Sequence, residues 1–147
     1  MKLVRFTLVA AACLIVFKLI SKPDSGLKQL EADFRAANQA KTIEPMLSLY
    51  HLEGSDKFTI SRLKLALQHE LALPIAKIRF EPLSGMPEET VQFIRNGVRY
   101  GPTLEPLHKM RVTYRVEDHF SSLYTIGKTE TGAWKFISAK PVSSSDR

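Results

Sequence analysis

Cysteine is nearly absent from this chain. Cys13 is the single cysteine among 147 residues, so the body of the protein beyond the first 22 residues has none. No disulfide framework and no thiolate metal site can form there. A body without cysteine suits an oxidising compartment, because no thiol is left to mispair. The histidines at positions 51, 69, 108 and 119 also lack the spacing of metal ligands, so no metal site is expected.

Several short motifs of nucleotide and acyl-transfer chemistry are missing as well. The sequence contains no G-x-S-x-G nucleophile elbow, no glycine-rich phosphate loop and no G-x-G-x-x-G fingerprint. It has no low-complexity tract and no internal repeat. A hydrophobic content of 44% is that of one globular domain with a buried core. We expect no cofactor.

Basic side chains outnumber acidic ones by 21 to 15, a formal charge of +6. Four of the basic residues lie in the first 22 positions, which contain no acid; 21 minus 4 leaves 17 against 15, a net of +2. A protein that binds duplex nucleic acid needs its Lys and Arg gathered on one face. Here they alternate with acids, so no nucleic-acid partner is expected.

Residues 1–22 are typical of an export signal. Lys2 and Arg5 precede an apolar run over residues 6–17. The run is shorter than the about 20 residues that span a bilayer, which favours a cleaved signal peptide. No small-x-small cleavage pattern follows the run, which favours retention of the leader. The sequence AAAC at Cys13 leaves lipidation open. A buried N-terminal helix is the structural alternative. We expect an uncleaved anchor at the periplasmic face of a membrane, or secretion if the leader is cleaved.

Residues 23–26 are expected to be a linker, residues 27–142 a single domain and residues 143–147 a polar tail. Apolar spacing of three and four predicts a helix over about residues 26–40. A short second helix is expected to end at Tyr50 and His51. A third should start at the cap residue Asp56 and stop at Pro74. Its inward-facing residues are expected to be Phe58, Leu63, Leu67 and Leu71.

From residue 76 onward the hydrophobic period falls to two, which predicts strands. The expected strands cover residues 76–82, 107–116, 120–128 and 133–139, with TETG as a tight hairpin loop. Between residues 84 and 106 two interpretations stay open. Pro87 with two following glutamates indicates a helix start, whereas Asn96 and Gly97 indicate a two-residue hairpin.

Helices first and antiparallel strands afterwards are typical of an α+β domain in which helices pack on a curved antiparallel sheet. Two stretches, FRAANQAKTIEPMLSLYHLEG and YTIGKTETGAWKFISAKPV, resemble the helix–loop region and the final hairpin of the nuclear transport factor 2-like, or cystatin-like, superfamily. The resemblance implies a cone with a pocket at its open end. It also implies a range of functions from cyclases, dehydratases and ketosteroid isomerases to non-catalytic modules. The catalytic aspartate and histidine positions of those enzymes have no one-to-one match here.

Three residues are candidates for acid–base chemistry. His51 could be a general base oriented by Glu53 or Asp56. The favoured alternative is that His51 ends a helix and Asp56 caps the next one. His108 is the ionisable residue on the apolar face of its strand and could point into a pocket mouth, although a strand-end histidine near water is the favoured interpretation.

Four aromatic residues are candidates for ligand binding: Tyr50, Tyr114, Tyr124 and Trp134. Packing across strands in the core is the alternative for such side chains. We therefore expect an exported, membrane-tethered, non-catalytic module. It would bind a protein partner or a second copy through its sheet face, or a small apolar ligand. The alternative is an isomerase, cyclase or dehydratase that uses a pocket histidine.

Overall fold

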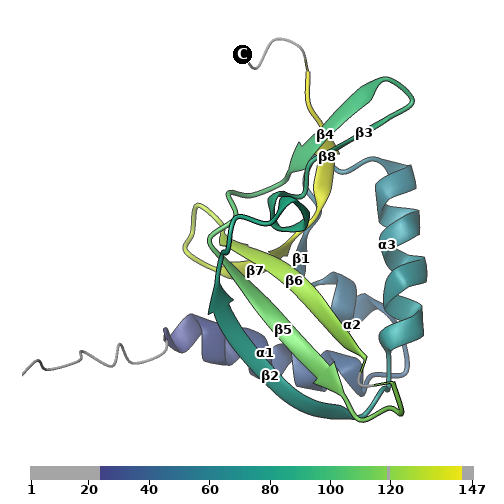
Figure 1. Cartoon of the computed structure of the whole chain (residues 1–147), viewed down its shortest axis with the longest axis vertical. Helices are drawn as coiled ribbons and strands as arrows, with labels where there is room; N and C mark the ends of the chain where they lie inside the picture. The colour runs from purple at the N-terminus through teal and green to yellow at the C-terminus, as the bar shows by residue number, and fades with distance from the viewer. Residues whose placement is uncertain (1–23, 119, 144–147) are drawn as a thin grey trace, which may run out of the picture.

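The computed structural model describes residues 24–118 and 120–143 (Figure 1). The predicted leader, the loop position His119 and residues 144–147 of the predicted tail lie outside this part. In chain order the elements are α1 (Ser25–Asn38), α2 (Glu44–Leu47), β1 (Tyr50–His51), α3 (Lys57–Glu70), β2 (Ile75–Pro82), the 3₁₀ turn η1 (Pro87–Thr90), β3 (Phe93–Arg95), β4 (Val98–Pro102), β5 (His108–Tyr114), β6 (Ser121–Lys128), β7 (Trp134–Ile137) and β8 (Ala139–Pro141). Within the described residues, no helix is both long and apolar enough to cross a membrane.

Helix α1 forms where the apolar periodicity predicts a helix. The Asp24 side chain caps it by accepting a hydrogen bond of 2.9 Å from the Gly26 N–H. Its buried stripe consists of Leu27, Leu30, Phe34 and Ala37. Because the cap precedes Ser25, residues Ser25 and Gly26 belong to the helix and not to a linker, which corrects that prediction.

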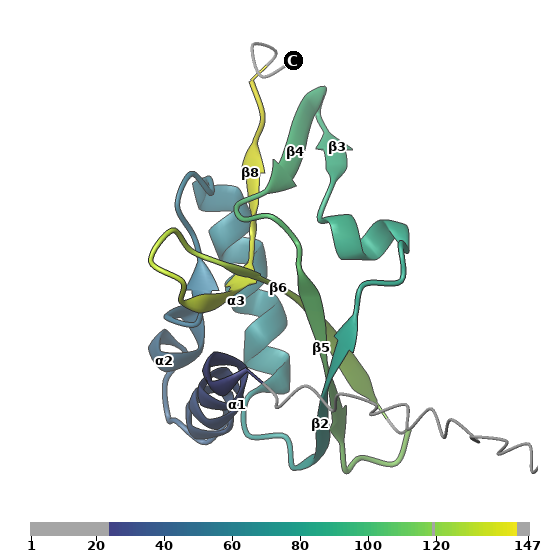
Figure 2. The same cartoon turned by 90° about the vertical axis from the view of Figure 1, so that its left-hand side faces the viewer.

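Five strands form the main sheet in the order β1-β7-β6-β5-β2. All neighbouring pairs are antiparallel except β1 with β7, which is parallel. The sheet is curved and does not close, and Figure 2 shows the helices on one side of it. The fully buried apolar core comes from α1 and the strands: Phe34, Met110, Val112, Ile126 and Phe136. The predicted α+β class, with helices against a curved and mostly antiparallel sheet, is confirmed.

A smaller sheet, β3-β4-β8, extends beyond one end of the main sheet (Figures 1 and 2). Both interpretations of residues 84–106 are correct. Pro87 begins η1, and Asn96 and Gly97, with φ of +50° and +76°, form the two-residue turn between β3 and β4. The predicted strand at residues 133–139 is instead two strands in different sheets. Reciprocal bonds between Thr103 and Ser138 redirect the chain there, because Thr103 N–H donates to the Ser138 carbonyl and Ser138 N–H to Thr103 Oγ1.

Tyr50 and His51 do not end the second helix as predicted. Helix α2 ends at Leu47, and the two residues form β1, in register with Phe136 and Ile137 of β7. The Phe136 N–H donates to the Leu49 carbonyl at 2.9 Å, which draws this segment onto the sheet edge. A tertiary contact therefore overrides the helical pattern.

Trp134 joins the last hairpin to the start of α1. Its side chain is 9% exposed, and the indole N–H donates to Asp24 Oδ2 at 3.1 Å. The ring lies so close to α1 that a Cβ atom on Gly26 would be 2.6 Å from Trp134 Cδ1. The predicted inward orientation of Trp134 and Phe136 is confirmed.

Replacing Trp134 with alanine should lower the free energy of unfolding by about 3–5 kcal/mol, because the cavity against α1 cannot be refilled. Lys135→Ala should change it by less than about 0.5 kcal/mol, since Lys135 points the other way and makes an exposed bond to the Ser48 carbonyl. Chemical denaturation measures both. Equal losses would contradict the alternation of this strand.

Candidate functional site

A groove of about 730 Å³ lies between α3 and the elements that face it. The α3 wall is formed by Phe58, Thr59, Arg62, Leu63 and Ala66. The opposite wall is formed by Val91, Phe93, Arg95, Ile137, Ser138 and Ala139. Most of these side chains are apolar, and the rings of Phe58 and Phe93 remain 39% and 43% exposed. Phe58 is thus a groove residue, and its predicted place in the core is wrong.

A second cavity, of about 200 Å³, adjoins the groove. Three residues, Leu63, Val91 and Ile137, line both spaces. The remaining lining comes from β1, η1, β6 and β7, with residues of β6 from both faces of the main sheet: Tyr50, Glu88, Leu123, Tyr124, Thr125 and Phe136. The two spaces therefore adjoin at these three residues, and we refer to the smaller one as the inner cavity.

The N-terminal end of α3 is fixed by the carboxylate of Asp56. One oxygen accepts a hydrogen bond of 2.7 Å from the Thr59 N–H and caps the helix, as predicted for Asp56. The other accepts a bond of 2.6 Å from the hydroxyl of Tyr100 on β4. These bonds, the one from Tyr100 first, hold the pKa of Asp56 below its usual range. Asp56 thereby links the helix to the smaller sheet.

The C-terminal end of α3 is fixed in the same way by Glu70. Its carboxylate accepts hydrogen bonds from the hydroxyls of Tyr124 and Tyr114, the latter at 3.2 Å. Burial raises the pKa of both tyrosines above the usual range. Both hydroxyls therefore keep their protons and act as donors.

Between these two ends α3 has little packing. Among its described residues only Leu67 is buried, while Leu63 is half-buried and Ala66 is exposed. Figure 1 shows the helix upright beside the sheet, with the β3–β4 hairpin above it. The polar bonds at its ends thus hold the helix in a position where its middle forms one wall of the groove.

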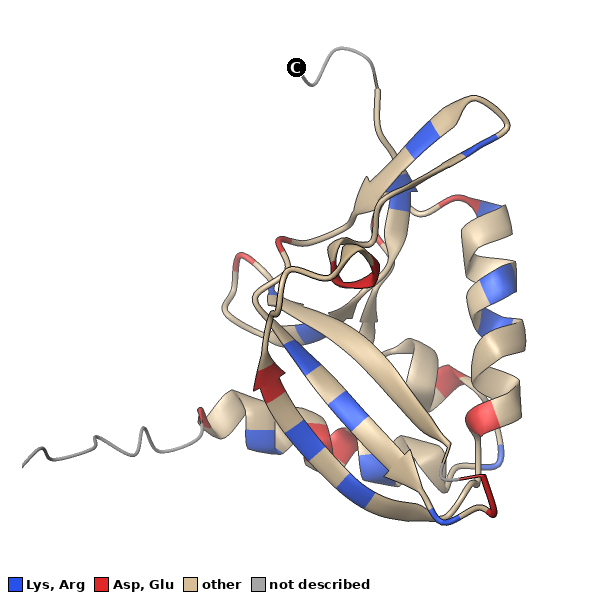
Figure 3. Ribbon diagram, in the orientation of Figure 1, with Lys and Arg blue, Asp and Glu red and all other residues tan. Residues whose placement is uncertain are grey.

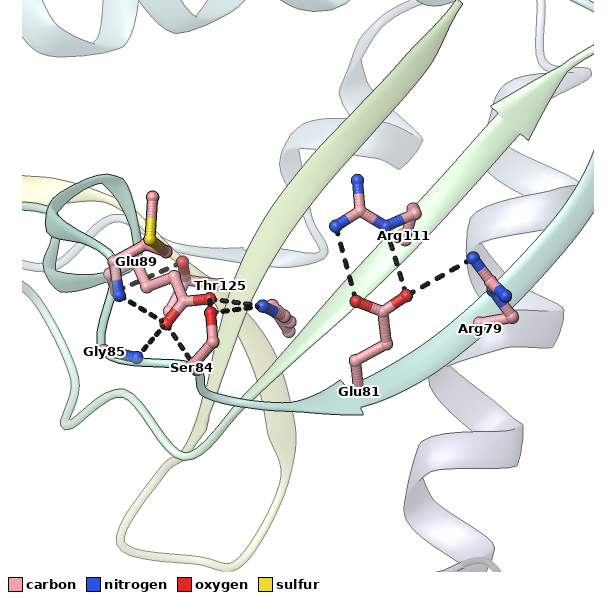
Figure 4. Close-up of polar contacts among 9 residues, drawn as sticks. Arg79, Glu81, Ser84, Gly85, Glu89, Arg111 and Thr125 are labelled. Carbon is pink, nitrogen blue, oxygen red and sulfur yellow. Dashed lines mark hydrogen bonds and ion pairs between the residues drawn. The ribbon is translucent and has the colours of Figure 1, made fainter. Parts of the chain in front are cut away.

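The opposite wall depends on a buried ion pair between Glu89 of η1 and Lys109 of β5. The Glu89 carboxylate, 2% exposed, also accepts bonds from the Ser84 N–H at 2.8 Å and the Gly85 N–H at 2.9 Å (Figure 4). The hydroxyl of Thr125 donates to the Glu89 carbonyl at 3.3 Å. Together these bonds fix η1 on the main sheet and so position Val91 and the β3 strand that follows.

The outer face of β2 and β5 is charged. Basic residues recur along both strands (Figure 3), and Glu81 lies between two of them, 3.1 Å from Arg111 and 3.6 Å from Arg79 (Figure 4). The large exposed apolar side chains of the hairpin and α3 are found elsewhere, and two of them, Phe58 and Phe93, line the groove. The full set is Phe58, Leu65, Phe93, Ile94 and Val98. An apolar partner therefore has more surface available at the groove than on this sheet face.

The structure does not bring the acid–base candidates together. His51 lines a separate polar pocket of about 460 Å³ with Glu53, whose carboxylate is 3.6 Å from its Nε2. The ring of His108 lies 5.5 Å from that of Trp134. Across residues 24–118 and 120–143, no hydrogen bond, ion pair or ring contact joins any two of His51, His108 and Asp56.

Three of the four aromatic candidates do converge. Tyr50 and Tyr124 line the inner cavity. Tyr114 does not line it, but its hydroxyl lies 3.3 Å from that of Tyr124 and both hydroxyls bond to Glu70. Trp134 lies apart from them, beside Asp24. The sequence interpretation missed Arg62 and Arg95; the spacing of Phe58, Arg62 and Ala66 on one helical face is the signal that this face is not entirely core.

Comparisons with known proteins do not add a relative. The sequence matches no model of a protein family, and no curated protein matches it. In the part of the chain that the structure describes, no group of three or more His, Cys, Asp or Glu side chains could hold a metal ion. The groove and the adjoining inner cavity are the candidate binding site of this protein.

Asp56→Ala should lower the melting temperature by about 2–8 °C, because it removes both the helix cap and the link to β4. Tyr100→Phe should have a smaller effect, since it removes the link alone. His51→Ala is the control and should change little. Thermal unfolding followed by circular dichroism measures all three, and a loss in His51→Ala as large as that in Asp56→Ala would contradict the assigned role.

Glu89 makes stability depend on pH. The hydrogen bond from Lys109, followed by those from Ser84 and Gly85, lowers the pKa of Glu89 from 4.5 to about 2. A group whose pKa is depressed on folding stabilises the protein above its unfolded pKa, and this contribution is lost as the pH falls through the folded pKa. Denaturation midpoints should therefore fall between pH about 4.5 and about 2. Glu89→Gln should be less stable at pH 7 and lose less stability over that interval; an unchanged acid slope would argue against this ion pair.

Proposed function

We propose that this protein is an exported, non-catalytic module that binds an apolar ligand in the groove between α3 and β3. The observation that carries the proposal is the groove itself, which adjoins the inner cavity at Leu63, Val91 and Ile137. Its volume of about 730 Å³ falls within the range of about 300–1,000 Å³ typical of small-molecule sites. Exposed apolar residues that gather at one place mark a binding surface.

A binding function is favoured over the isomerase, cyclase or dehydratase alternative. Tyr114 and Tyr124 keep their protons because burial raises the pKa of both, so they can donate hydrogen bonds but do not serve as bases. The histidine candidates His51 and His108 do not line the groove or the inner cavity. A general base within reach of a ligand there would have to be Glu88, which lines the inner cavity, and not the histidine of that alternative.

The relation to the nuclear transport factor 2-like superfamily is part of the proposal. Three N-terminal helices beside a curved, mostly antiparallel sheet support a cone of that kind. The leader is proposed to tether the module at the periplasmic face of a membrane, because a positive n-region followed by an apolar run is typical of an anchor. Such a position suits a ligand of low solubility in water.

Filling the groove tests this function. The domain, residues 23–147, should bind the neutral dye N-phenyl-1-naphthylamine saturably, with an increase in fluorescence. Ala66→Trp, which places a large ring in the groove, should weaken binding by about tenfold or more. Leu65→Trp is the matched control, because Leu65 is 56% exposed and does not line the groove. Equal binding by the two variants would exclude the groove as the site.

A further inference from the structure

Two arginines lie on opposite walls of the groove, at the end where α3 begins. Arg62 projects from α3 and Arg95 from β3, and their guanidinium carbons lie 6.0 Å and 3.0 Å from the ring centroid of Phe58. Among the described residues neither forms an ion pair with a carboxylate within 4.0 Å. The carboxylate of Asp56 is bonded to Tyr100 and Thr59, and the charge of Arg95 adds to these bonds in lowering the pKa of Asp56.

Neither guanidinium group is held in a salt bridge by a described residue, so both keep donors that can bind an anion beside the apolar groove. The planar fork of arginine matches the geometry of a carboxylate, and charge-assisted hydrogen bonds are about twice as strong as neutral ones. The ring of Phe58 lies within cation–π distance of both guanidinium groups, the nearer being that of Arg95. The groove thus combines an apolar surface with positive charge from two walls.

The far end of the site has the opposite charge. Glu88 lines the inner cavity, and the carboxylate of Glu70 lies behind the hydroxyl of Tyr124. An anionic group would be repelled there and attracted at the arginines, so charge alone orients a ligand that has one acidic end. The hydroxyl of Tyr50, which has no hydrogen bond to another described residue, lines this end as well.

We propose that the ligand is a free long-chain fatty acid. This inference rests on the proposed function and specifies its ligand. Its carboxylate binds Arg62 and Arg95, and its chain passes between Leu63 and Val91 into the inner cavity toward Tyr50. The inner cavity, at about 200 Å³, is smaller than a typical small-molecule site, so it suits the end of one chain and not two. A single-chain amphiphile therefore fits better than a diacyl lipid.

The test uses the full-length chain in phosphatidylcholine nanodiscs and two photoreactive probes. One is hexadecanoic acid with a diazirine on its chain, and the other is the corresponding hexadecanol. Labelled peptides are identified by mass spectrometry. The acid should label the segments around Leu63 and Ile137 saturably, and the alcohol should do so about tenfold more weakly, because it cannot form the charge-assisted bonds.

Variants of the two arginines separate charge from shape. Arg62→Gln with Arg95→Gln should reduce labelling by the acid about tenfold or more and leave labelling by the alcohol unchanged. Arg62→Lys with Arg95→Lys should restore part of it. Arg99→Gln is the matched control, because Arg99 lies on the same hairpin, paired with Ile94, and does not line the groove. Thermal unfolding checks that each variant is folded. If the variant with two glutamines does not fold, the variant with two lysines and the ratio of acid to alcohol labelling in the unchanged protein test the role of the arginines.

The outcomes distinguish this inference from the proposed function. Equal labelling by acid and alcohol, both blocked by Ala66→Trp, would overturn the acidic head group and leave apolar binding intact. If Ala66→Trp left the labelling by both probes unchanged, both the fatty-acid inference and the proposed function would be overturned. Stronger protection by diacyl phosphatidylglycerol than by unlabelled hexadecanoic acid would overturn the fatty-acid assignment in favour of a phospholipid. Loss of labelling as the protein associates at higher concentration would overturn it in favour of a second copy.

Discussion

Two carboxylates, one at each end of α3, determine the shape of this protein's binding surface. Asp56 accepts a hydrogen bond from Tyr100 at one end, and Glu70 accepts bonds from Tyr114 and Tyr124 at the other. The bond at Asp56 joins the helix to the smaller sheet and the bonds at Glu70 join it to the main sheet, so the helix bridges the two sheets. The space beneath its middle is the groove. A helix fixed by apolar packing along its length would have filled this space.

This arrangement has an energetic consequence. A helix of 14 residues is marginal in water without tertiary packing, and among the described residues of α3 only Leu67 is buried. The cap and the tyrosine bonds replace part of the missing apolar contacts. A ligand in the groove would supply the rest, and any ligand that binds only the folded state also stabilises it. Binding and the stability of α3 are therefore coupled in the proposed function.

The facing wall depends on a different device. Glu89 and Lys109 form a buried ion pair. Removing either partner would leave the other as a buried charge without compensation. Such a pair contributes position more than net stability, because desolvation offsets much of the attraction. It holds η1 on the main sheet, and the chain then runs through Val91 into the strand that carries Arg95. The salt bridge positions one end of this wall, while the tyrosine–carboxylate bond at Asp56 ties β4, the strand paired with β3, to α3 and so links the two walls.

Features that depend on neighbours in the chain could be predicted from the sequence alone. The cap at Asp56 and the turn at Asn96 and Gly97 are local, since their geometry is set within a few residues. The α+β order follows from hydrophobic periodicity for the same reason. The β1 strand at His51, the division of β7 from β8 and the groove were decided by the tertiary structure. Their determinants are contacts across the fold, such as the bond between Tyr100 and Asp56, which are 44 residues apart. Periodicity says which face of an element is apolar, but only packing decides whether that face is covered or left open for a ligand.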